Sequence, residues 1–227
     1  MIDPKKVFIV IPAYNETEVI ASVISRILPY RYSIVVVDDG SCPGLYPLIK
    51  EMPVFFLRHK VNLGQGAAIQ TGLEFSVTRL ADYIVTFDAD GQHDANDIEK
   101  LLQILIGNQL DIVLGSRFIA TATHIPWRRK WLLQLARWLN YFFTGLFLTD
   151  AHNGFRVMNR KAAMAIRLTE NGMAHATEIL ICIKKNQLHF TEAPVHVYYT
   201  DYSRRKGQGL WNSFRIFFDI LLNKIFG

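Results

Sequence analysis

Oxygen-bearing side chains cluster in the stretch YIVTFDADGQHDANDIEKLL, residues 83–102, directly after an apolar run. Asp88, Asp90 and Gln92 are spaced two residues apart, so in an extended or gently turning backbone they face the same side. Carboxylate and amide oxygens are hard ligands, which suit Mg²⁺ or Mn²⁺ and suit a structural zinc site poorly. A solvated turn has the same spacing, but a buried strand that runs straight into the cluster favours a metal site.

Two other ligand-binding motifs do not fit. An EF-hand needs glycine at its sixth position and a preceding helix, whereas Gly91 is the fourth residue of DADGQHDANDIE and a strand-like run precedes it. The stretch NLGQG, residues 62–66, has two glycines but lacks the third at the spacing of a dinucleotide-binding turn. The acidic cluster therefore indicates a different kind of site.

Apolar runs that alternate with helical patterns must position these residues. The alternation predicts an α/β fold with a Rossmann-like, mostly parallel sheet flanked by helices. Ligands of such sheets bind at the carboxyl ends of the strands, where Asp38 and Asp39 also follow an apolar run. We expect Asn96 to be the N-cap of the helix that follows the acidic cluster. The predicted strands cover 6–12, 33–37, 54–59, 83–87, 110–118 and 191–199, the predicted helices 16–28, 64–77, 96–105, 126–148, 176–185 and 210–227, and a turn covers 149–163.

Composition limits the class of protein. A chain of 227 residues with 50% hydrophobic and 20% charged residues is long enough for one domain with a sizeable core. Its formal charge of +5 suits an anionic surface or substrate without the basic density of a nucleic-acid binder. The two cysteines, Cys42 and Cys182, belong to no CxxC or Cys/His cluster, which makes a reducing, cytoplasmic location the default. The short apolar run near the N-terminus lacks a cleavage site and is predicted to be a strand.

Two apolar stretches, 131–148 and 210–227, carry internal charges and are not predicted to span a membrane. In the second, polar residues recur at helical spacing on one side of a wide aromatic and aliphatic arc, as in a helix that lies in a membrane interface. The cationic run Arg204, Arg205 and Lys206 precedes it and would favour anionic headgroups or a lipid phosphate. The alternative is a helix packed on the domain core or in a dimer interface.

Seven segments together resemble one enzyme family. The chain resembles the inverting family-two glycosyltransferases of GT-A fold, and within them it is similar to the polyprenyl- or dolichyl-phosphate glycosyltransferases. The resemblance implies a glycosyltransferase domain over 1–207, and the residue pattern adds an amphipathic membrane-interface helix over 208–227 as part of the same unit. The matching segments are VIPAYNE, VVVDDGS, NLGQGAAIQTGLE, TFDADGQHDANDI, GSRF, DAHNGFRVMNRKA and TEAPVHVYY, in family order.

The resemblance also implies roles for individual residues. The metal ligands would be Asp88, Asp90 and Gln92, holding Mg²⁺ or Mn²⁺ against the donor diphosphate, with Asp90 and Arg117 acting in catalysis. Arg117 and Arg156 would meet phosphate charge, which arginine binds with bidentate geometry. The nucleotide would be bordered by Pro12, Tyr14, Glu16, Asp39 and Gly64, with Asp39 reading the base.

The acceptor decides whether a general base is needed. A hydroxyl must lose its proton in the transition state, whereas a lipid phosphate is already ionised near neutral pH. If a base is required, the candidates are Asp150 and Glu178, and more weakly His175.

The expected activity is metal-dependent, inverting transfer of a sugar from a nucleoside diphosphate, with UDP favoured over GDP, to polyprenyl (undecaprenyl) phosphate. The alternatives are transfer to a saccharide hydroxyl in polysaccharide assembly and a non-catalytic nucleotide- or lipid-binding scaffold. Many relatives of this kind continue into transmembrane helices, whereas this chain stops after one amphipathic segment. We therefore expect peripheral attachment to the cytoplasmic face of the membrane, with a homo-oligomer or a membrane-protein partner as further expectations, and no nucleic-acid partner.

Overall fold

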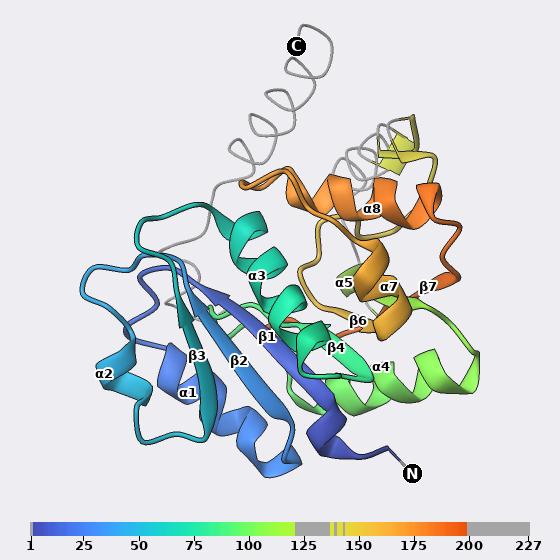
Figure 1. The fold of residues 1–227 in the computed structure, drawn as a ribbon. Helices are drawn as coiled ribbons and strands as arrows, with labels where there is room; N and C mark the ends of the chain where they lie inside the picture. The colour runs from blue at the N-terminus through green and yellow to red at the C-terminus, as the bar shows by residue number, and fades with distance from the viewer. Residues whose placement is uncertain (1, 121–136, 139, 143, 199–227) are drawn as a thin grey trace, which may run out of the picture.

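The computed structural model describes residues 2–120, 137–138, 140–142 and 144–198. Seven strands form one sheet in the order β3-β2-β1-β4-β6-β5-β7, with helices on both sides (Figure 1). The strands are β1 Val7–Ala13, β2 Ser33–Asp38, β3 Val54–Arg58, β4 Tyr83–Thr86, β5 Ile112–Ser116, β6 Arg156–Asn159 and β7 Phe190–Pro194. The helices are α1 Ile20–Ile27, α2 Tyr46–Ile49, α3 Gln65–Thr78, α4 Asn96–Gly107, α5 Arg117–Ala120, α7 Arg160–Ala165 and α8 His175–Lys185, with the short 3-10 helices η1 Pro4–Lys6 and η2 Leu28–Tyr30.

The sheet is mostly parallel, as predicted. The strands β3, β2, β1 and β4 pair in parallel, and β5 pairs in parallel with β7. The exception is β6, which runs antiparallel between β4 and β5. In its register, Arg156 lies opposite Thr86 of β4 and Leu114 of β5. The start of β6 therefore lies at the sheet edge where β4 and β5 end.

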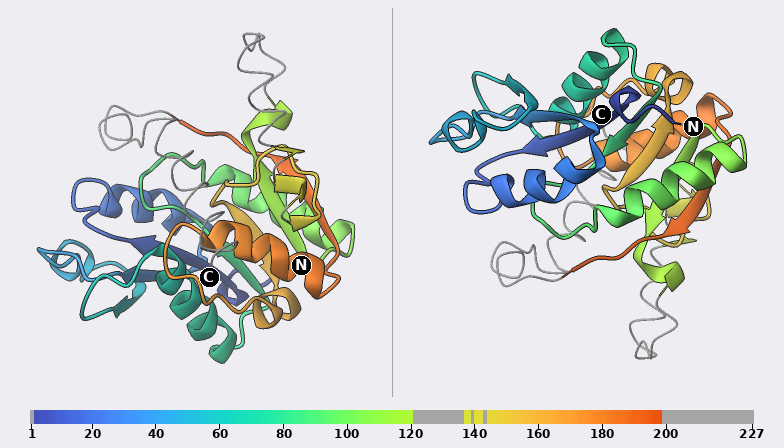
Figure 2. Two further views of the ribbon diagram at one scale, coloured as in Figure 1. Left: turned by 90° about the horizontal axis from the view of Figure 1, so that it is seen from above. Right: turned by 90° about the horizontal axis from the view of Figure 1, so that it is seen from below.

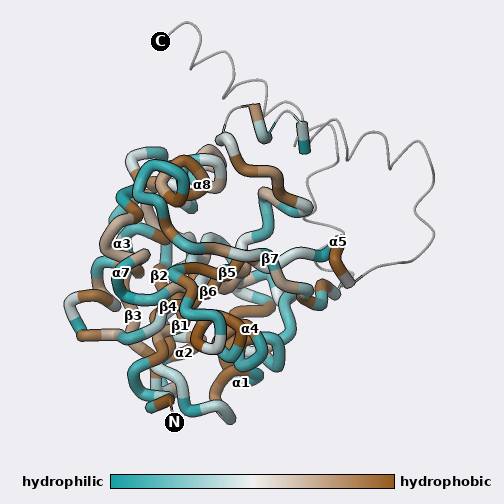
Figure 3. Tube along the Cα trace, turned by 90° about the vertical axis from the view of Figure 1, so that its right-hand side faces the viewer, coloured by the Kyte–Doolittle hydropathy of each residue, from teal (hydrophilic) through white to brown (hydrophobic). Residues whose placement is uncertain are grey.

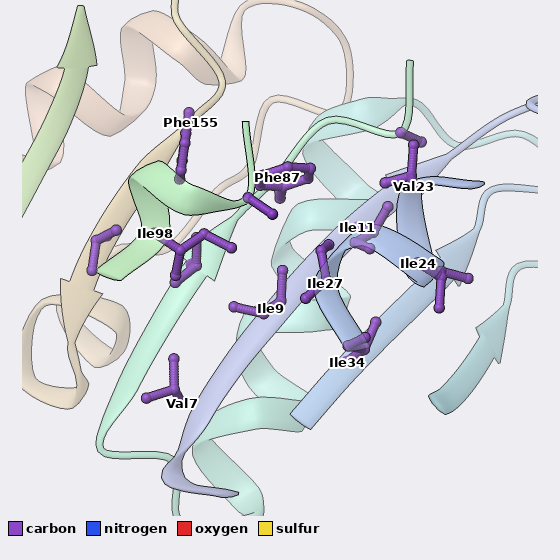
Figure 4. Packing of buried hydrophobic residues seen from close by; sticks show 14 of the residues in the cluster. Val7, Ile9, Ile11, Val23, Ile24, Ile27, Ile34, Phe87, Ile98 and Phe155 are labelled. Carbon is purple, nitrogen blue, oxygen red and sulfur yellow. The ribbon is translucent and has the colours of Figure 1, made fainter. Parts of the chain in front are cut away.

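Both faces of the sheet are covered, which explains why the central strands β1 and β2 are apolar and buried along almost their whole length. Val7, Ile9 and Ile11 pack with α1, α2 and α4, whereas Phe8 and Val10 pack with α3, α7 and α8 on the opposite face. Figure 2 shows these helices on the two sides of the sheet, and Figure 4 shows the first core at close range. The hydropathy colouring in Figure 3 places much of the hydrophobic sequence in the central strands.

The structure corrects the prediction of a turn over 149–163. The chain forms a loop only up to Phe155, then the strand β6 and the helix α7. The strand was missed because it is four residues long, begins with an arginine and is followed at once by a helix. Asn159 ends the strand and caps α7, since its side-chain oxygen accepts a hydrogen bond from the Ala162 amide at 2.8 Å.

The bounds of several other predicted elements differ from the structure by a few residues. The predicted strand at 191–199 begins one residue earlier and ends at Pro194, and the short helix α2 was not foreseen. Asn96 is the first residue of α4 rather than its cap, because the Asp94 carboxylate accepts the Asn96 amide hydrogen at 2.9 Å. In the helix predicted over 126–148, residues 137–138, 140–142 and 144 are helical, while 121–136 and the predicted final helix lie outside the described residues. No described helix is long and apolar enough to cross a membrane.

Asp111 ties together three strands at the edge of the sheet opposite the acidic cluster. Its carboxylate accepts hydrogen bonds from the Asn159 side chain at 3.0 Å, the His189 amide at 2.9 Å and the Lys161 ammonium at 3.0 Å. Burial raises the pKa of Asp111, but these hydrogen bonds and the charge of Lys161 outweigh it and lower the pKa overall. The carboxylate therefore stabilises the fold in its ionised form.

Replacing Asp111 by Asn should lower the free energy of unfolding by about 1–3 kcal/mol at neutral pH, because an amide cannot accept all of these donors. Since the folded pKa is depressed, the contribution is present above the unfolded pKa and is lost as pH falls through the folded pKa. Urea unfolding should thus show a difference in the free energy of unfolding between wild type and variant that is constant from about pH 7 to about pH 5 and narrows at lower pH. Asp82→Asn, which removes an exposed partner of Arg160, is the matched control, and an equal loss in both variants would contradict the assignment.

Candidate active site

The acidic cluster lies at the carboxyl edge of the sheet, in a hollow of about 290 Å³ including its open mouth. Four segments meet there: the loop after β4, the start of α5 after β5, the loop that leads into the antiparallel strand β6, and the chain that follows β7. Because β6 runs against its neighbours, its first residues reach the edge where the parallel strands end. The lining residues are Asp88, Asp90, Gln92, His93, Arg117, His152, Asn153, Gly154 and Val197.

Asp88 is held on both oxygens. The His93 Nε2 atom lies 3.0 Å from its Oδ2, and the Gln65 side chain donates to its Oδ1 at 3.2 Å. Gly154 packs against the same carboxylate, since a Cβ built there would lie 2.3 Å from Oδ2. Burial raises the pKa of Asp88, but the hydrogen bond and charge of His93 and the charge of Arg156 lower it overall. Asp88 is therefore ionised and fixed in orientation.

Asp90 has the opposite tendency. Burial raises its pKa, and the nearby charge of Asp88 raises it further, although the hydrogen bond from the Gln92 amide at 3.0 Å opposes the shift. Glu16, from the loop after β1, adds to the negative potential at Asp90. Two carboxylates whose pKa values are moved apart form a site that gains from a cation.

The donor set fits a divalent ion that is coordinated by oxygen atoms, some from the protein and the rest from a substrate. Within the described part of the chain, no group of three or more His, Cys, Asp or Glu side chains is placed to hold a metal ion. The protein instead offers Asp88 and Asp90, with the Gln92 side chain in the same hollow. Mg²⁺ is commonly held by one or two carboxylates together with substrate phosphates. A diphosphate that completes the coordination is consistent with this donor set.

Arg117 is fixed in the pocket wall by Asp150. Its Nε and Nη2 atoms donate to the two Asp150 oxygens at 2.7 and 2.8 Å, and its backbone amide donates at 3.1 Å. Asp150 is itself held by Glu192 of β7, which accepts the Thr149 and Asp150 amide hydrogens at 2.8 and 3.0 Å. Burial raises the pKa of Asp150, but Arg117 and Asn153 lower it overall. Asp150 is thus an ionised partner that orients Arg117.

Arg156 lies behind the pocket and is buried, with 1% of its surface exposed. Its Nη1 atom has no hydrogen-bond partner among the described residues. Burial lowers its pKa to about 10, while the charges of Asp88 and Asp150 favour the cation. Arg156 therefore acts first as a buried counter-charge to the two carboxylates, and direct contact with a phosphate, as expected from the sequence, would require a change in this packing.

Three histidines surround this charge cluster. Burial and the charge of Arg156 lower the pKa of His175 to about 4, and its Nδ1 atom lies 2.8 Å from the Gly172 carbonyl oxygen. At the rim of the pocket, desolvation by the surrounding protein and the charges of Arg156 and Arg117 lower the pKa of His152. Near neutral pH both imidazoles are therefore neutral. His93 stacks edge-on against Phe87, and its buried Nδ1 atom has no described partner.

The expected nucleotide-binding residues lie farther along the same edge. Asp39 is buried, and its oxygens accept the Leu63 and Gly64 amide hydrogens at 2.9 and 2.7 Å and contact the His59 ring at 2.7 Å. Asp39 therefore fixes the loop before α3. Gly64 has a φ of +106° and packs so closely on Asn171 that a side chain would not fit. The described geometry gives Asp39 a structural task, and its contact with a base stays a prediction.

The remaining predicted residues are dispersed. Pro12 is buried within β1, whereas Tyr14 is 47% exposed just beyond it. Glu178 lies on α8, where its two oxygens accept the Thr169 and Glu170 amide hydrogens at 3.0 Å. This anchors a loop and leaves Glu178 outside the pocket lining. The run 204–206 lies outside the described residues.

Several residues of the site were not singled out from the sequence. Gln65 and His93 hold Asp88, Glu192 holds the loop that carries Asp150, and Asn153 donates to Asp150 at 3.3 Å. The sequence offered one signal for His93, its position directly after the metal motif. Gln65 and Glu192 are brought in by α3 and β7; both lie in segments that match the family, but nothing in those segments indicates a contact with Asp88 or with the Asp150 loop.

The chain is similar to known enzymes over most of its length. It is 31% identical to the UDP-N-acetylglucosamine–dolichyl-phosphate N-acetylglucosaminyltransferase of Methanococcus voltae over 243 aligned positions, which cover 97% of each chain. It is 30% identical to the polyprenol monophosphomannose synthase of Mycolicibacterium smegmatis over 73% of this chain and 66% of that one.

Solved structures share the fold. The mannosyl-3-phosphoglycerate synthase from Rubrobacter xylanophilus matches with a TM-score of 0.68 at 18% identity, over 95% of this chain and 71% of that one. The glucosyl-3-phosphoglycerate synthase of Mycobacterium tuberculosis, in complex with Mn²⁺ and UDP, matches with a TM-score of 0.65 at 18% identity, over 86% and 72% of the two chains. These similarities show a common GT-A architecture.

The family model for glycosyl transferase family 2 matches residues 8–167. This range spans the sheet from β1 to β6 and includes every residue that lines the pocket except Val197. The chain therefore belongs to glycosyltransferase family 2 and is a glycosyltransferase.

Proposed function

We propose that this enzyme transfers a sugar, with inversion, from a nucleoside diphosphate to a polyprenyl phosphate at a membrane surface. UDP is the favoured nucleotide and GDP the alternative. The names of two similar enzymes specify such lipids: the dolichyl-phosphate N-acetylglucosaminyltransferase of Methanococcus voltae and the polyprenol monophosphomannose synthase of Mycolicibacterium smegmatis. The similar Mycobacterium tuberculosis synthase binds UDP with Mn²⁺.

The observation that carries the proposed acceptor concerns the two carboxylates considered as a general base, Asp150 and Glu178. Both are already bound to other groups of the protein. Asp150 forms a bidentate ion pair with Arg117, and Glu178 is bound to backbone amides away from the pocket. A phosphate oxygen is ionised near neutral pH and attacks without losing a proton to the protein. Among the described residues, the acids that line the pocket are the proposed metal ligands Asp88 and Asp90, and such a pocket with a fixed arginine suits an acceptor that needs no base.

In the proposed reaction, Asp88, Asp90 and Gln92 hold a divalent ion, Mg²⁺ or Mn²⁺, against the donor diphosphate. The ion supplies Lewis-acid stabilisation of the charge that develops on the leaving diphosphate. Arg117, fixed by Asp150, presents its guanidinium to a phosphate group. Arg156 maintains the charge balance behind the carboxylates. Tyr14, Glu16 and the loop at Gly64 border the nucleotide.

The activity is tested by incubating the chain with nucleotide sugars, Mg²⁺ or Mn²⁺ and undecaprenyl phosphate, and by following labelled sugar into the lipid phase. Asp90→Ala should abolish turnover, because one of two protein carboxylates for the ion is lost, and should weaken metal-dependent binding of the donor. Glu99→Gln, an exposed change on α4, is the matched control and should keep wild-type activity. No glycolipid from any donor would rule out the proposed acceptor.

His152 supports a second candidate, transfer to a saccharide hydroxyl. Its pKa is lowered and it lines the pocket, so its neutral ring is available to accept a proton from a hydroxyl bound there. His152→Gln separates the two candidates. Transfer to a lipid phosphate should change less than about threefold, whereas loss of a general base would lower turnover by about 10²–10⁴-fold with donor binding intact.

A group of exposed aromatic side chains in the described part of the chain supports contact with a membrane. Trp138, Tyr141, Phe142 and Phe147 are exposed by 60%, 46%, 83% and 48%, and Arg137 lies over the Phe147 ring at 4.5 Å. Exposed aromatic side chains beside a cation suit the headgroup region of an anionic bilayer. Together they support peripheral contact with a membrane surface, and the cytoplasmic face is the location we propose for it.

Replacing Trp138 and Phe142 together by Ser should reduce binding to anionic liposomes in a flotation assay, because large apolar side chains are lost from the interface. Met164→Ser removes an apolar side chain that is 51% exposed on α7 and should leave binding unchanged. Wild-type flotation of the double variant would instead assign membrane contact to another surface.

A further inference from the structure

The chain beyond β7 runs along the loop that carries the acidic cluster. We name Val195–Tyr198 the strap and Asp88–Asp94 the acidic loop. The Tyr198 amide donates to the Gln92 carbonyl oxygen at 2.8 Å, and the strap forms one antiparallel bridge with the loop, between Val197 and His93. The strap is therefore bonded to the backbone of a proposed metal ligand and of its neighbour.

The strap is anchored to α4 through Asp97, whose side chain is buried. Asp97 accepts the His196 amide hydrogen at 2.7 Å and lies 3.0 Å from the His196 Nδ1 atom. Lys100 donates to the other Asp97 oxygen at 2.8 Å from the solvent side. Asp97 thus contacts both the backbone and the side chain of His196 in the strap.

The end of the strap has its own anchor. The Tyr198 hydroxyl donates to Asp94 Oδ2 at 2.9 Å, while Asp94 Oδ1 accepts the Asn96 amide hydrogen at 2.9 Å. Asp94 therefore links the strap to the first residue of α4. The strap therefore has one anchor at His196 and a second at Tyr198, the residue whose amide bonds to Gln92.

The acidic loop turns at Gly91, the residue before Gln92. Gly91 has a φ of +76°, in the left-handed region, and the Arg26 side chain reaches its carbonyl oxygen at 3.4 Å, a long contact. Within the loop, the Gln92 amide donates to Asp90. Movement of the Gln92 backbone would therefore also move the hydrogen bond that orients the Asp90 carboxylate.

We propose that Asp97 and Tyr198 are positioning residues for the metal site: by holding the strap, they fix the backbone at Gln92 and so the orientation of Gln92 and Asp90 toward the ion. Residues that orient metal ligands without touching the metal tune its affinity, and their loss commonly weakens binding by about 10–100-fold. This inference rests on the proposed function, because it requires that the acidic loop binds a divalent ion.

The experiment measures Mn²⁺ binding by the full chain with electron paramagnetic resonance, in the presence of UDP or of GDP, whichever the wild type binds. Asp97→Asn should weaken Mn²⁺ binding by about tenfold, and Tyr198→Phe, which removes one hydroxyl, by about threefold. Lys100→Met removes the solvent-side partner of Asp97 without touching the strap and should leave Mn²⁺ binding unchanged. Nucleotide affinity without metal should be the same in all three variants.

Turnover supplies a second readout that a general loss of stability would not produce. In both strap variants the Mn²⁺ concentration for half-maximal activity should rise, while excess Mn²⁺ should restore kcat. Thermal unfolding establishes that each variant is folded, and if Asp97→Asn does not fold, Tyr198→Phe decides alone. Folded strap variants with wild-type Mn²⁺ affinity would overturn the positioning role. A wild-type chain that binds no Mn²⁺ with either nucleotide would overturn the metal site itself.

Discussion

The organisation of this enzyme depends on the cost of placing two carboxylates, Asp88 and Asp90, at the end of a buried strand. Like charges at close range raise each other's energy, and removal from water adds to that cost. The surrounding structure offsets the cost unequally. Asp88 is stabilised by His93, Gln65 and the buried Arg156, and its pKa falls, whereas the pKa of Asp90 rises. A cation bound by both carboxylates would offset their remaining repulsion. The site therefore suits a divalent ion that binds together with a diphosphate.

The antiparallel strand β6 makes this charge balance possible. In a fully parallel sheet the residues that precede this strand would lie at the opposite edge, far from the end of β4. Because β6 runs in reverse, Arg156 pairs in register with both β4 and β5, and Gly154 packs against Asp88. The same reversal brings Asp150 to Arg117, and Glu192 from β7 fixes that corner. One reversed strand therefore delivers the buried counter-charge and the partner of the surface arginine together.

The sequence was most informative where local chemistry and periodicity agree. Continuous apolar runs that end in Asp39 or Asp88 predicted parallel strands and located the ligand edge, and the two-residue spacing of Asp88 and Asp90 identified the acidic site. Local sequence could not reveal β6, because four residues that begin with Arg156 resemble a turn. It also could not reveal that Gln65 and Glu192 reach the site, since those contacts join residues 23 and 43 positions apart. Arg156 was expected at a phosphate, and its burial could be recognised only from the packing of the sheet.

Several described carboxylates are bound to donors within the protein, whereas Asp88 and Asp90 line the pocket. This difference bears on which acceptor the enzyme can use. Asp39 fixes the loop before α3, Asp97 grips the strap, Glu178 holds the amides at 169–170, and Asp150 orients Arg117. Each accepts several hydrogen bonds, so its oxygens are already bound to donors within the protein. Among the described residues, the carboxylates that line the pocket are Asp88 and Asp90, the pair that suits a metal ion, and the proposed lipid-phosphate acceptor would need no further carboxylate.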